Sequence, residues 1–169
     1  VSDICCTSSN ALKIVKNSTE KDIIFVPDKN LGDYIQKQVP EKNIILWPGF
    51  CPTHEKIATE FLNDAKSKYP KAKILTHPEC NPELVDMSDF VGSTSQIIDY
   101  TKSDNSAQYI ICTEEGVLHQ MKKNNPKKEY HIVADNVLCK NMKITTLNKI
   151  YDALKNNIYE VTVDKDIAK

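Results

Sequence analysis

Short runs of apolar, mostly β-branched residues alternate along the chain with stretches in which apolar positions recur every three or four residues. An unbroken apolar run is typical of a strand buried on both faces, whereas the longer spacing predicts an amphipathic helix. Strands are therefore predicted at 23–26, 43–47, 73–76, 109–112 and 131–133. Helices are predicted between and after them, at 11–15, 31–39, 54–68, 97–100, 116–121 and 147–154. This alternation indicates an α/β fold with small parallel sheets covered by helices on both faces.

The order of these elements repeats within the chain. Residues 2–9 and 88–95 both read as a strand that runs into a hydroxyl-rich turn and a helix, at an offset of 88 − 2 = 86 residues. Later segments match at offsets of 86 to 88 residues, namely 23–26 with 109–112, 44–46 with 131–133, Cys51 with Cys139, and 73–76 with 160–163. We therefore predict tandem copies of a three-layer αβα unit, at 1–86 and 87–169.

Composition excludes several classes of function. The net charge of -1 argues against a nucleic-acid surface built from bulk positive charge. All basic residues are lysines, so bidentate guanidinium clamps on phosphate or carboxylate are not available from this chain. No apolar run approaches the roughly 20 residues that span a bilayer, and no secretory leader is recognisable. We expect a cytoplasmic protein that binds neither nucleic acid nor membrane.

The cysteines suggest part of a metal site. There are six cysteines and no Cys-x-x-Cys pair, and we expect them to be reduced thiols. Cys51 and Cys139 each lie in a turn after a strand, at equivalent places of the repeat, and equivalent turns that face a common axis would bring them together. Two thiolates are an incomplete cluster site, whereas three copies would supply three and leave one iron open. Cys5, Cys6 and Cys112 are interpreted as buried packing residues and Cys80 as a neighbour of the site.

Polar turns at the carboxyl ends of strands are candidate ligand sites. The turns at 7–10 and 92–95 lead from a strand into a helix, whose free N–H groups and dipole favour a carboxylate or phosphate. Simple helix capping is the competing interpretation of their hydroxyl groups. Two such turns that serve one axis would suit a ligand with two carboxylates.

Two histidines are candidates for the same site. His77 and Glu79 follow the strand at 73–76, and a histidine beside a carboxylate can transfer protons near neutral pH. His54 could face the site or merely begin a helix, while His119 and His131 are expected to be structural.

Taken together, seven stretches in order resemble the quinolinate synthase A family. They are Cys-Thr-Ser-Ser-Asn-Ala (6–11), Pro-Asp-Lys-Asn-Leu-Gly (27–32), Trp-Pro-Gly-Phe-Cys-Pro-Thr-His (47–54), His-Pro-Glu-Cys (77–80), Gly-Ser-Thr-Ser (92–95), Thr-Glu-Glu-Gly (113–116) with His119, and Cys-Lys-Asn-Met-Lys (139–143). The resemblance implies three αβα domains around a pseudo-threefold axis, with a [4Fe-4S] cluster held by one cysteine from each. Cys51 and Cys139 would then be cluster ligands.

The resemblance also implies a reaction of de novo NAD biosynthesis, in which iminoaspartate condenses with dihydroxyacetone phosphate to give quinolinate, phosphate and water. Ser8 and Thr94 would hold substrate carboxylates, and His77 and Glu79 would bind substrate and transfer protons. The open iron would act as a Lewis acid. An aspartate-oxidising enzyme that supplies iminoaspartate is an expected partner.

One departure from the family pattern is that its N-terminal domain, with the third cluster cysteine, has no counterpart in this sequence. We therefore expect no turnover from this chain alone. Two alternatives remain open at this point. One is a non-catalytic α/β module that binds a dicarboxylate at its two helix starts, and the other is a zinc-dependent hydrolase that uses Cys51, Cys139 and a histidine.

Overall fold

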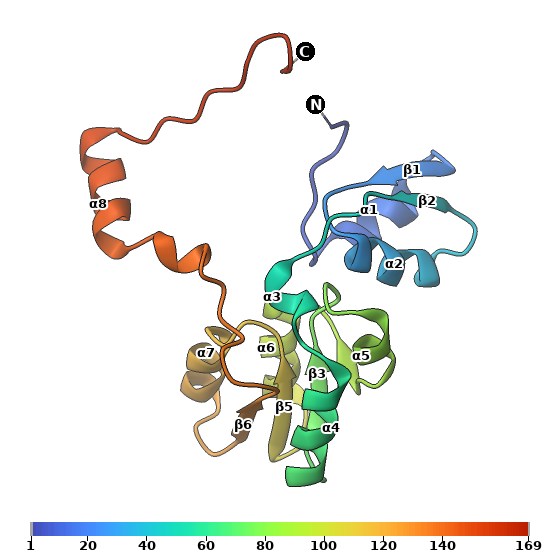
Figure 1. Cartoon of the computed structure of the whole chain (residues 1–169), viewed down its shortest axis with the longest axis vertical. Coiled ribbons are helices and arrows are strands. Elements are labelled where there is room, and N and C mark those ends of the chain that lie inside the picture. The colour runs from blue at the N-terminus through green and yellow to red at the C-terminus, as the bar shows by residue number, and fades with distance from the viewer. Residues whose placement is uncertain (1, 169) are drawn as a thin grey trace. The chain divides into compact units, whose positions relative to one another are not determined.

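The computed structural model of the chain describes residues 2–168, which form two compact units (Figure 1). The larger unit runs from Cys6 to Leu138, and the smaller one combines residues 2–5 with residues 139–168.

The larger unit is an α/β structure with two small parallel sheets, as predicted. Its strands are β1 (Asp22–Phe25), β2 (Asn43–Leu46), β3 (Lys73–Thr76), β4 (Phe90–Val91), β5 (Gln108–Cys112) and β6 (Glu129–Ile132). Its helices are α1 (Ala11–Asn17), α2 (Lys29–Gln38), α3 (Pro52–Glu55), α4 (Thr59–Lys68), α5 (Pro82–Asp86), α6 (Thr94–Ser103) and α7 (Val117–Asn124). One sheet pairs β1 with β2, and the other has the order β4-β3-β5-β6.

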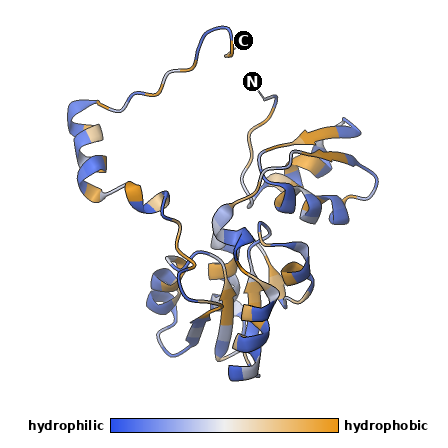
Figure 2. Cartoon of the chain, viewed as in Figure 1, coloured by the Kyte–Doolittle hydropathy of each residue, from blue (hydrophilic) through white to orange (hydrophobic). Residues whose placement is uncertain are grey.

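The four-stranded sheet is the middle layer of three. Neighbouring residues of a strand point to opposite faces, so Ile74 and Ile110 pack with α4 and α5, while Leu75 and Ile111 pack with α6 and α7. The centres of β3 and β5 are accordingly coloured as hydrophobic in Figure 2. Because both faces are buried there, the central residues of these two strands are apolar, which is why the sequence pattern predicted them correctly.

The two-stranded sheet is covered on one face among the described residues. Phe25 and Ile44 pack against α1 and α2, whereas Ile24 on the opposite face is 73% exposed. This sheet and its helices therefore form two layers within the larger unit.

The strand pairing recurs at one of the offsets predicted for the repeat. Asp22 of β1 pairs with Asn43 of β2, and Gln108 of β5 pairs with Glu129 of β6. The offsets are 108 − 22 = 86 and 129 − 43 = 86, so the same register recurs one repeat later. Since β3 pairs with both β4 and β5, the four-stranded sheet draws strands from both sides of residue 86. The division into 1–86 and 87–169 stays a prediction.

Two predicted strands do not form. Residues 2–6 lie exposed and outside any described strand, and so do residues 160–163. The equivalent of the first segment, β4, is held in place by pairing with β3. No described strand pairs with residues 2–6 or 160–163, and an isolated strand is not stable on its own.

The helix predicted at 54–68 is broken into α3 and α4. Ala58 has extended backbone angles, and Ile57 is fully buried in the core below. The side-chain amide of Asn81 donates to the carbonyl of Ile57 at 3.2 Å, which satisfies a group that a continuous helix would have used internally.

The smaller unit contains a short 3₁₀ turn at Met142–Ile144 and helix α8 (Leu147–Asn156), where a helix was predicted. The hydroxyl of Thr146 caps α8 by accepting from the N–H of Lys149 at 3.3 Å. No helix within residues 2–168 has the length and apolar character that a membrane crossing requires.

Replacing Ile110 with Ala should destabilise the larger unit by about 2–5 kcal/mol, because this fully buried side chain fills the core between β5 and the α4–α5 layer. Denaturant unfolding followed by circular dichroism would measure the loss. Ile24→Ala is the matched control, since Ile24 is exposed on β1 and its truncation should cost less than about 0.5 kcal/mol. Equal losses at both positions would contradict the assignment of the core.

Candidate active site

A group of polar side chains lies at the carboxyl edge of the four-stranded sheet. His77 follows β3 directly and Thr113 follows β5 directly, and the two strands end together because Thr76 pairs with Cys112. The N–H of His77 also donates to the carbonyl of Cys112 at 3.1 Å. In parallel α/β sheets this is the edge at which ligands bind.

The segment after β2 brings Cys51 and His54 to the same edge. The buried carboxylate of Asp28 holds this segment, because Oδ2 accepts from the N–H of Cys51 at 2.7 Å and Oδ1 accepts from the N–H of Leu31 at 2.8 Å. Gly49 is required beside it, since a Cβ atom there would collide with the carbonyl oxygen of Pro27. Asp28 thus caps α2 and fixes the backbone of Cys51 at once.

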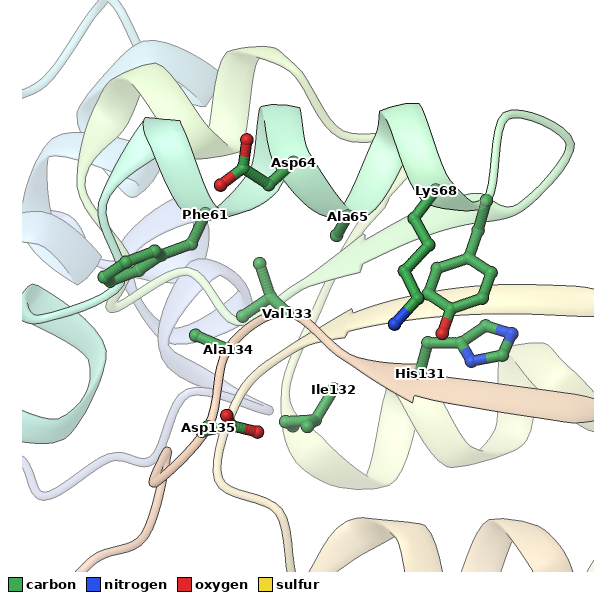
Figure 3. Close-up of a pocket in the computed structure, with 10 residues that line it drawn as sticks. Phe61, Asp64, Ala65, Lys68, His131, Ile132, Val133, Ala134 and Asp135 are labelled. Atoms are coloured by element: carbon green, nitrogen blue, oxygen red, sulfur yellow. The ribbon is translucent and has the colours of Figure 1, made fainter.

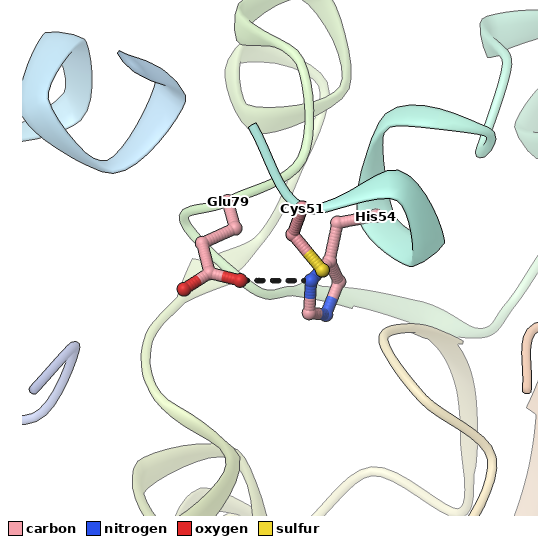
Figure 4. A group of neighbouring side chains, drawn as sticks. All are labelled: Cys51, His54 and Glu79. Carbon is pink, nitrogen blue, oxygen red and sulfur yellow. Dashed lines mark hydrogen bonds and ion pairs between the residues drawn. The ribbon is translucent and has the colours of Figure 1, made fainter. Parts of the chain in front are cut away.

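His54 is buried and uses both ring nitrogens. Nδ1 lies 3.1 Å from Oε2 of Glu79, and Nε2 lies 2.9 Å from the hydroxyl of Thr113. An ionised carboxylate can only accept, so Nδ1–H donates to Glu79 and Nε2 accepts from Thr113. Figure 4 shows the first of these contacts beside the thiol of Cys51.

His77 stacks on His54, with ring centroids 4.4 Å apart and an interplanar angle of 12°. Its Nδ1 accepts from the N–H of Glu79 at 3.3 Å, which leaves the ring proton on Nε2. That nitrogen lies 3.2 Å from the hydroxyl of Ser8, in the turn before α1. The structure therefore brings Ser8 next to His77, and the roles of Ser8, His77 and Glu79 in substrate binding stay a prediction.

A hydrogen bond connects the loop that carries Glu79 to the first turn of α2. The amide of Asn30 donates to the backbone carbonyl of Glu79 at 3.0 Å and to Oε2 of Glu55 at 2.8 Å. Lys29 forms an ion pair with Oε1 of Glu55 at 3.1 Å. The segment after Asp28 thus supports the site through its side chains as well as its backbone.

Burial and neighbouring charges set the ionisation of this group. Burial and, to a lesser extent, the nearby His54 lower the pKa of His77 to about 4, although Glu79 opposes the shift. Burial alone would raise the pKa of Glu79, but the hydrogen bond from His54 and the proximity of His77 outweigh it and lower the pKa. At neutral pH the site therefore contains a neutral His77 and an ionised Glu79.

Cys51 is a thiol rather than a thiolate in the absence of a cation. Burial raises its pKa, and Glu79 and Asp28 raise it further, while the N–H groups of His54 and Thr53 partly offset the effect. Cys51, His54 and Glu79 each offer one ligand atom, and these atoms lie within 4.8 Å of one another. Thiolate, imidazole and carboxylate are the ligand types that transition metals prefer.

With this geometry known, comparison with other proteins assigns the chain to a family. The family described as Quinolinate synthetase A protein matches residues 1–169. The chain belongs to the quinolinate synthetase A family.

Its relatives are close in sequence but longer. Proteins called Quinolinate synthase from Caldicellulosiruptor saccharolyticus and Caldicellulosiruptor bescii are 50% and 52% identical over 99% and 98% of this chain. A third, from Alkaliphilus metalliredigens, is 49% identical over 97% of this chain. The matches cover 55%, 55% and 54% of those proteins, so the chain spans about half the length of the curated relatives it matches.

No described contact connects two of the residues expected from the family pattern, Thr94 and Cys139, to this group. Thr94 is the exposed first residue of α6, beside Ser93, which caps that helix in a capping box with Gln96. It follows β4, whose end adjoins that of β3, but no described hydrogen bond connects it to His77. Cys139 belongs to the smaller unit, so its pairing with Cys51 stays a prediction.

The remaining cysteines differ in burial, and His131 has an aromatic stacking partner. Cys80 and Cys112 are fully buried, as expected for Cys112, and burial raises the pKa of Cys112 to about 12. Cys5 and Cys6 were predicted to be buried at a strand end and are exposed, because that strand does not form. His131 stacks on Tyr69, with centroids 3.5 Å apart, which agrees with a structural role.

Three site residues were not predicted, namely Thr113, Asp28 and Asn30, and the sequence left His54 open between a site residue and a helix start. Each lies within one of the family-like stretches noted above, and the Cys-x-x-His spacing of Cys51 and His54 was a usable signal. Their roles depend on contacts with distant segments, which the local pattern does not contain.

A groove of about 630 Å³ lies elsewhere, between α4 and the edge strand β6 (Figure 3). Its lining residues are Phe61, Asp64, Ala65, Lys68, Tyr69, His131, Ile132, Val133, Ala134 and Asp135. None of the predicted site residues lines it, so the candidate active site is the polar group at the strand ends.

The low pKa of His77 predicts a pH-dependent stability in the absence of added metal. A histidine with a pKa of about 4 in the folded chain and about 6.5 when unfolded binds more protons when unfolded, so its contribution is full above pH 6.5 and is lost as pH falls towards 4. Between pH 7 and pH 5 the loss from His77 should be about 1–2 kcal/mol. Urea unfolding at several pH values would measure it.

His77→Gln should flatten this part of the pH profile, and NMR titration of the His77 ring would locate its pKa directly. A His77 pKa near 6.5, or an unchanged slope in the variant, would contradict the burial argument.

Proposed function

We propose that this chain is part of a quinolinate synthase, which condenses iminoaspartate with dihydroxyacetone phosphate to give quinolinate with loss of phosphate and water. The observation that carries the proposal is the close grouping of Ser8, His77 and Glu79 at the strand ends, in a chain about 50% identical to proteins of that name. An enzyme that oxidises aspartate would supply the iminoaspartate.

Substrate binding would begin at the helix starts. The Ser8 hydroxyl and His77 Nε2–H lie 3.2 Å apart and suit a substrate carboxylate. Thr94 at the start of α6 would hold a second carboxylate with the help of the helix dipole. A chain without arginine would thus bind an anionic substrate through hydroxyls, N–H groups and lysines.

The ionised Glu79 and the neutral His77 would carry out different proton transfers. The ionised Glu79 can accept a proton from carbon during enolisation or dehydration. The neutral His77 can donate its Nε2 proton to a substrate oxygen. His54 keeps the Glu79 carboxylate in place through Nδ1 and keeps His77 in place through ring stacking.

The proposed enzyme uses a [4Fe-4S] cluster with Cys51 and Cys139 as ligands and a third cysteine from outside this chain. Cys51 fits this role because it is a half-buried thiol at the edge of the site, with its backbone fixed by Asp28. Cys139 is also half-buried and forms no disulfide with another described cysteine. When bound, the cluster supplies a Lewis-acidic iron for a substrate hydroxyl or ring nitrogen.

Anaerobic reconstitution with iron and sulfide tests the cluster. The protein used would be this chain joined to the additional part of one of its longer relatives. We expect a broad absorption near 400 nm and the matching EPR signal on reduction, as is usual for thiolate-ligated [4Fe-4S] centres. Cys51→Ser and Cys139→Ser should each abolish it.

Cys5→Ser is the control for this experiment, because Cys5 is an exposed thiol with no predicted role. Retention of the absorption in both Cys51→Ser and Cys139→Ser would mean that these cysteines only pack. A dicarboxylate-binding module without iron would then be the better account.

In the same joined protein, Glu79→Gln should lower kcat by about 10²–10⁴-fold, because the amide cannot accept a proton. Steady-state assays of quinolinate formation would measure the change. Glu83→Gln on α5 is the matched control, since Glu83 is exposed and only four residues away. A Glu79→Gln enzyme with normal kcat would remove Glu79 from the proton transfers.

A further inference from the structure

We propose that Cys51, His54 and Glu79 form a binding site for a single divalent transition-metal ion of the zinc or ferrous class. This site differs from the cluster of the proposed function because all three ligands come from one unit and Cys139 takes no part. The proposal does not depend on the synthase reaction.

The three ligand atoms are already close to a metal-binding arrangement. Sγ of Cys51, Nδ1 of His54 and a carboxylate oxygen of Glu79 lie within 4.8 Å of one another, and the nitrogen and oxygen are 3.1 Å apart. With metal–ligand bonds of about 2.0–2.3 Å, ligands of a tetrahedral site are about 3.3–3.8 Å apart. Shifts of about 1 Å or less would therefore close the site around an ion.

The surrounding hydrogen bonds support each ligand separately. Asp28 holds the N–H of Cys51, and Asn30 holds the backbone carbonyl of Glu79. These bonds fix the backbone positions from which the Cys51 and Glu79 side chains extend.

The hydroxyl of Thr113 can bond to His54 both in the metal-free chain and when His54 binds a metal. In the metal-free chain Thr113 donates to Nε2 while Nδ1–H faces Glu79. When a metal replaces the proton on Nδ1, the ring carries its proton on Nε2, and that N–H can donate to the same hydroxyl, because a threonine hydroxyl both donates and accepts. The 2.9 Å contact is therefore preserved as the histidine becomes a ligand.

Three protein ligands leave the fourth tetrahedral position open to water or another ligand. Metal binding also removes the Cys51 thiol proton and cancels the charge of a half-buried carboxylate.

Because Cys51 is common to this site and to the proposed cluster, the two metals would compete for it. Zinc bound here would hinder cluster assembly, whereas a ferrous ion would occupy one of the cluster's own ligands first.

Cobalt(II) titration of the 169-residue chain under anaerobic conditions tests the proposal. We expect one equivalent to bind, with a thiolate-to-cobalt charge-transfer band in the near ultraviolet and the intense visible bands of four-coordinate cobalt. Zinc should displace the cobalt and abolish both. Cys51→Ser should lose the charge-transfer band, and Glu79→Gln should weaken binding at least about tenfold.

Two matched pairs of variants make the test specific. Cys139→Ser should bind cobalt as the parent chain does, in contrast to Cys51→Ser. Thr113→Val should weaken binding about tenfold or more, whereas Thr113→Ser, which keeps the hydroxyl, should not. Circular dichroism of each variant separates loss of a ligand from loss of the fold.

Absence of the thiolate band in the folded parent chain would overturn the proposal. It would also be overturned if Cys139→Ser removed the band, or if Glu79→Gln had no effect on affinity. None of these outcomes bears on cluster formation in the joined protein, so failure of this site and failure of the synthase proposal are distinguishable.

Discussion

The candidate active site depends on the hydrogen bonds and the ring stacking of the buried His54 side chain. This side chain connects Glu79, on the loop after β3, to Thr113, at the end of β5, and it supports His77 by stacking. A polar ring in this position would destabilise the fold if either nitrogen lacked a partner. Because both nitrogens are bonded, the ring can instead fix the orientation of two side chains that would transfer protons.

The carboxylate of Asp28 is likewise buried, and hydrogen bonds compensate its burial. Asp28 is only 5% exposed, and burial raises its pKa, yet its two oxygens accept N–H groups from Leu31 and Cys51 that partly offset this cost. A carboxylate that caps a helix thereby also sets the position of a candidate metal ligand. The site is thus built from groups whose hydrogen bonds serve the fold and the chemistry together.

The sequence predicted those strands that a local run of apolar residues marks. Strands such as β3 and β5 are unbroken apolar runs because both faces are buried, and the pattern located them within one residue. The pattern also placed His77 and Glu79 at a strand end beside a hydroxyl-rich turn. It could not predict the break between α3 and α4, because that break depends on a hydrogen bond from Asn81, 24 residues further along the chain. The sequence left the role of His54 undecided for the same reason, since its partners lie 25 and 59 residues away.

The position of His54 also connects the two kinds of chemistry proposed for the site. Its Nδ1 faces a carboxylate and a thiol at once, so the same atom can carry a proton or bind a metal. In the first state Glu79 remains an available base, whereas in the second it becomes a ligand and can no longer accept a proton. A metal held by all three side chains would therefore suppress proton transfer by Glu79. A cluster that takes only Cys51 from this group would leave the pair of His54 and Glu79 intact, so in the proposed synthase the thiol and the carboxylate would serve separate roles.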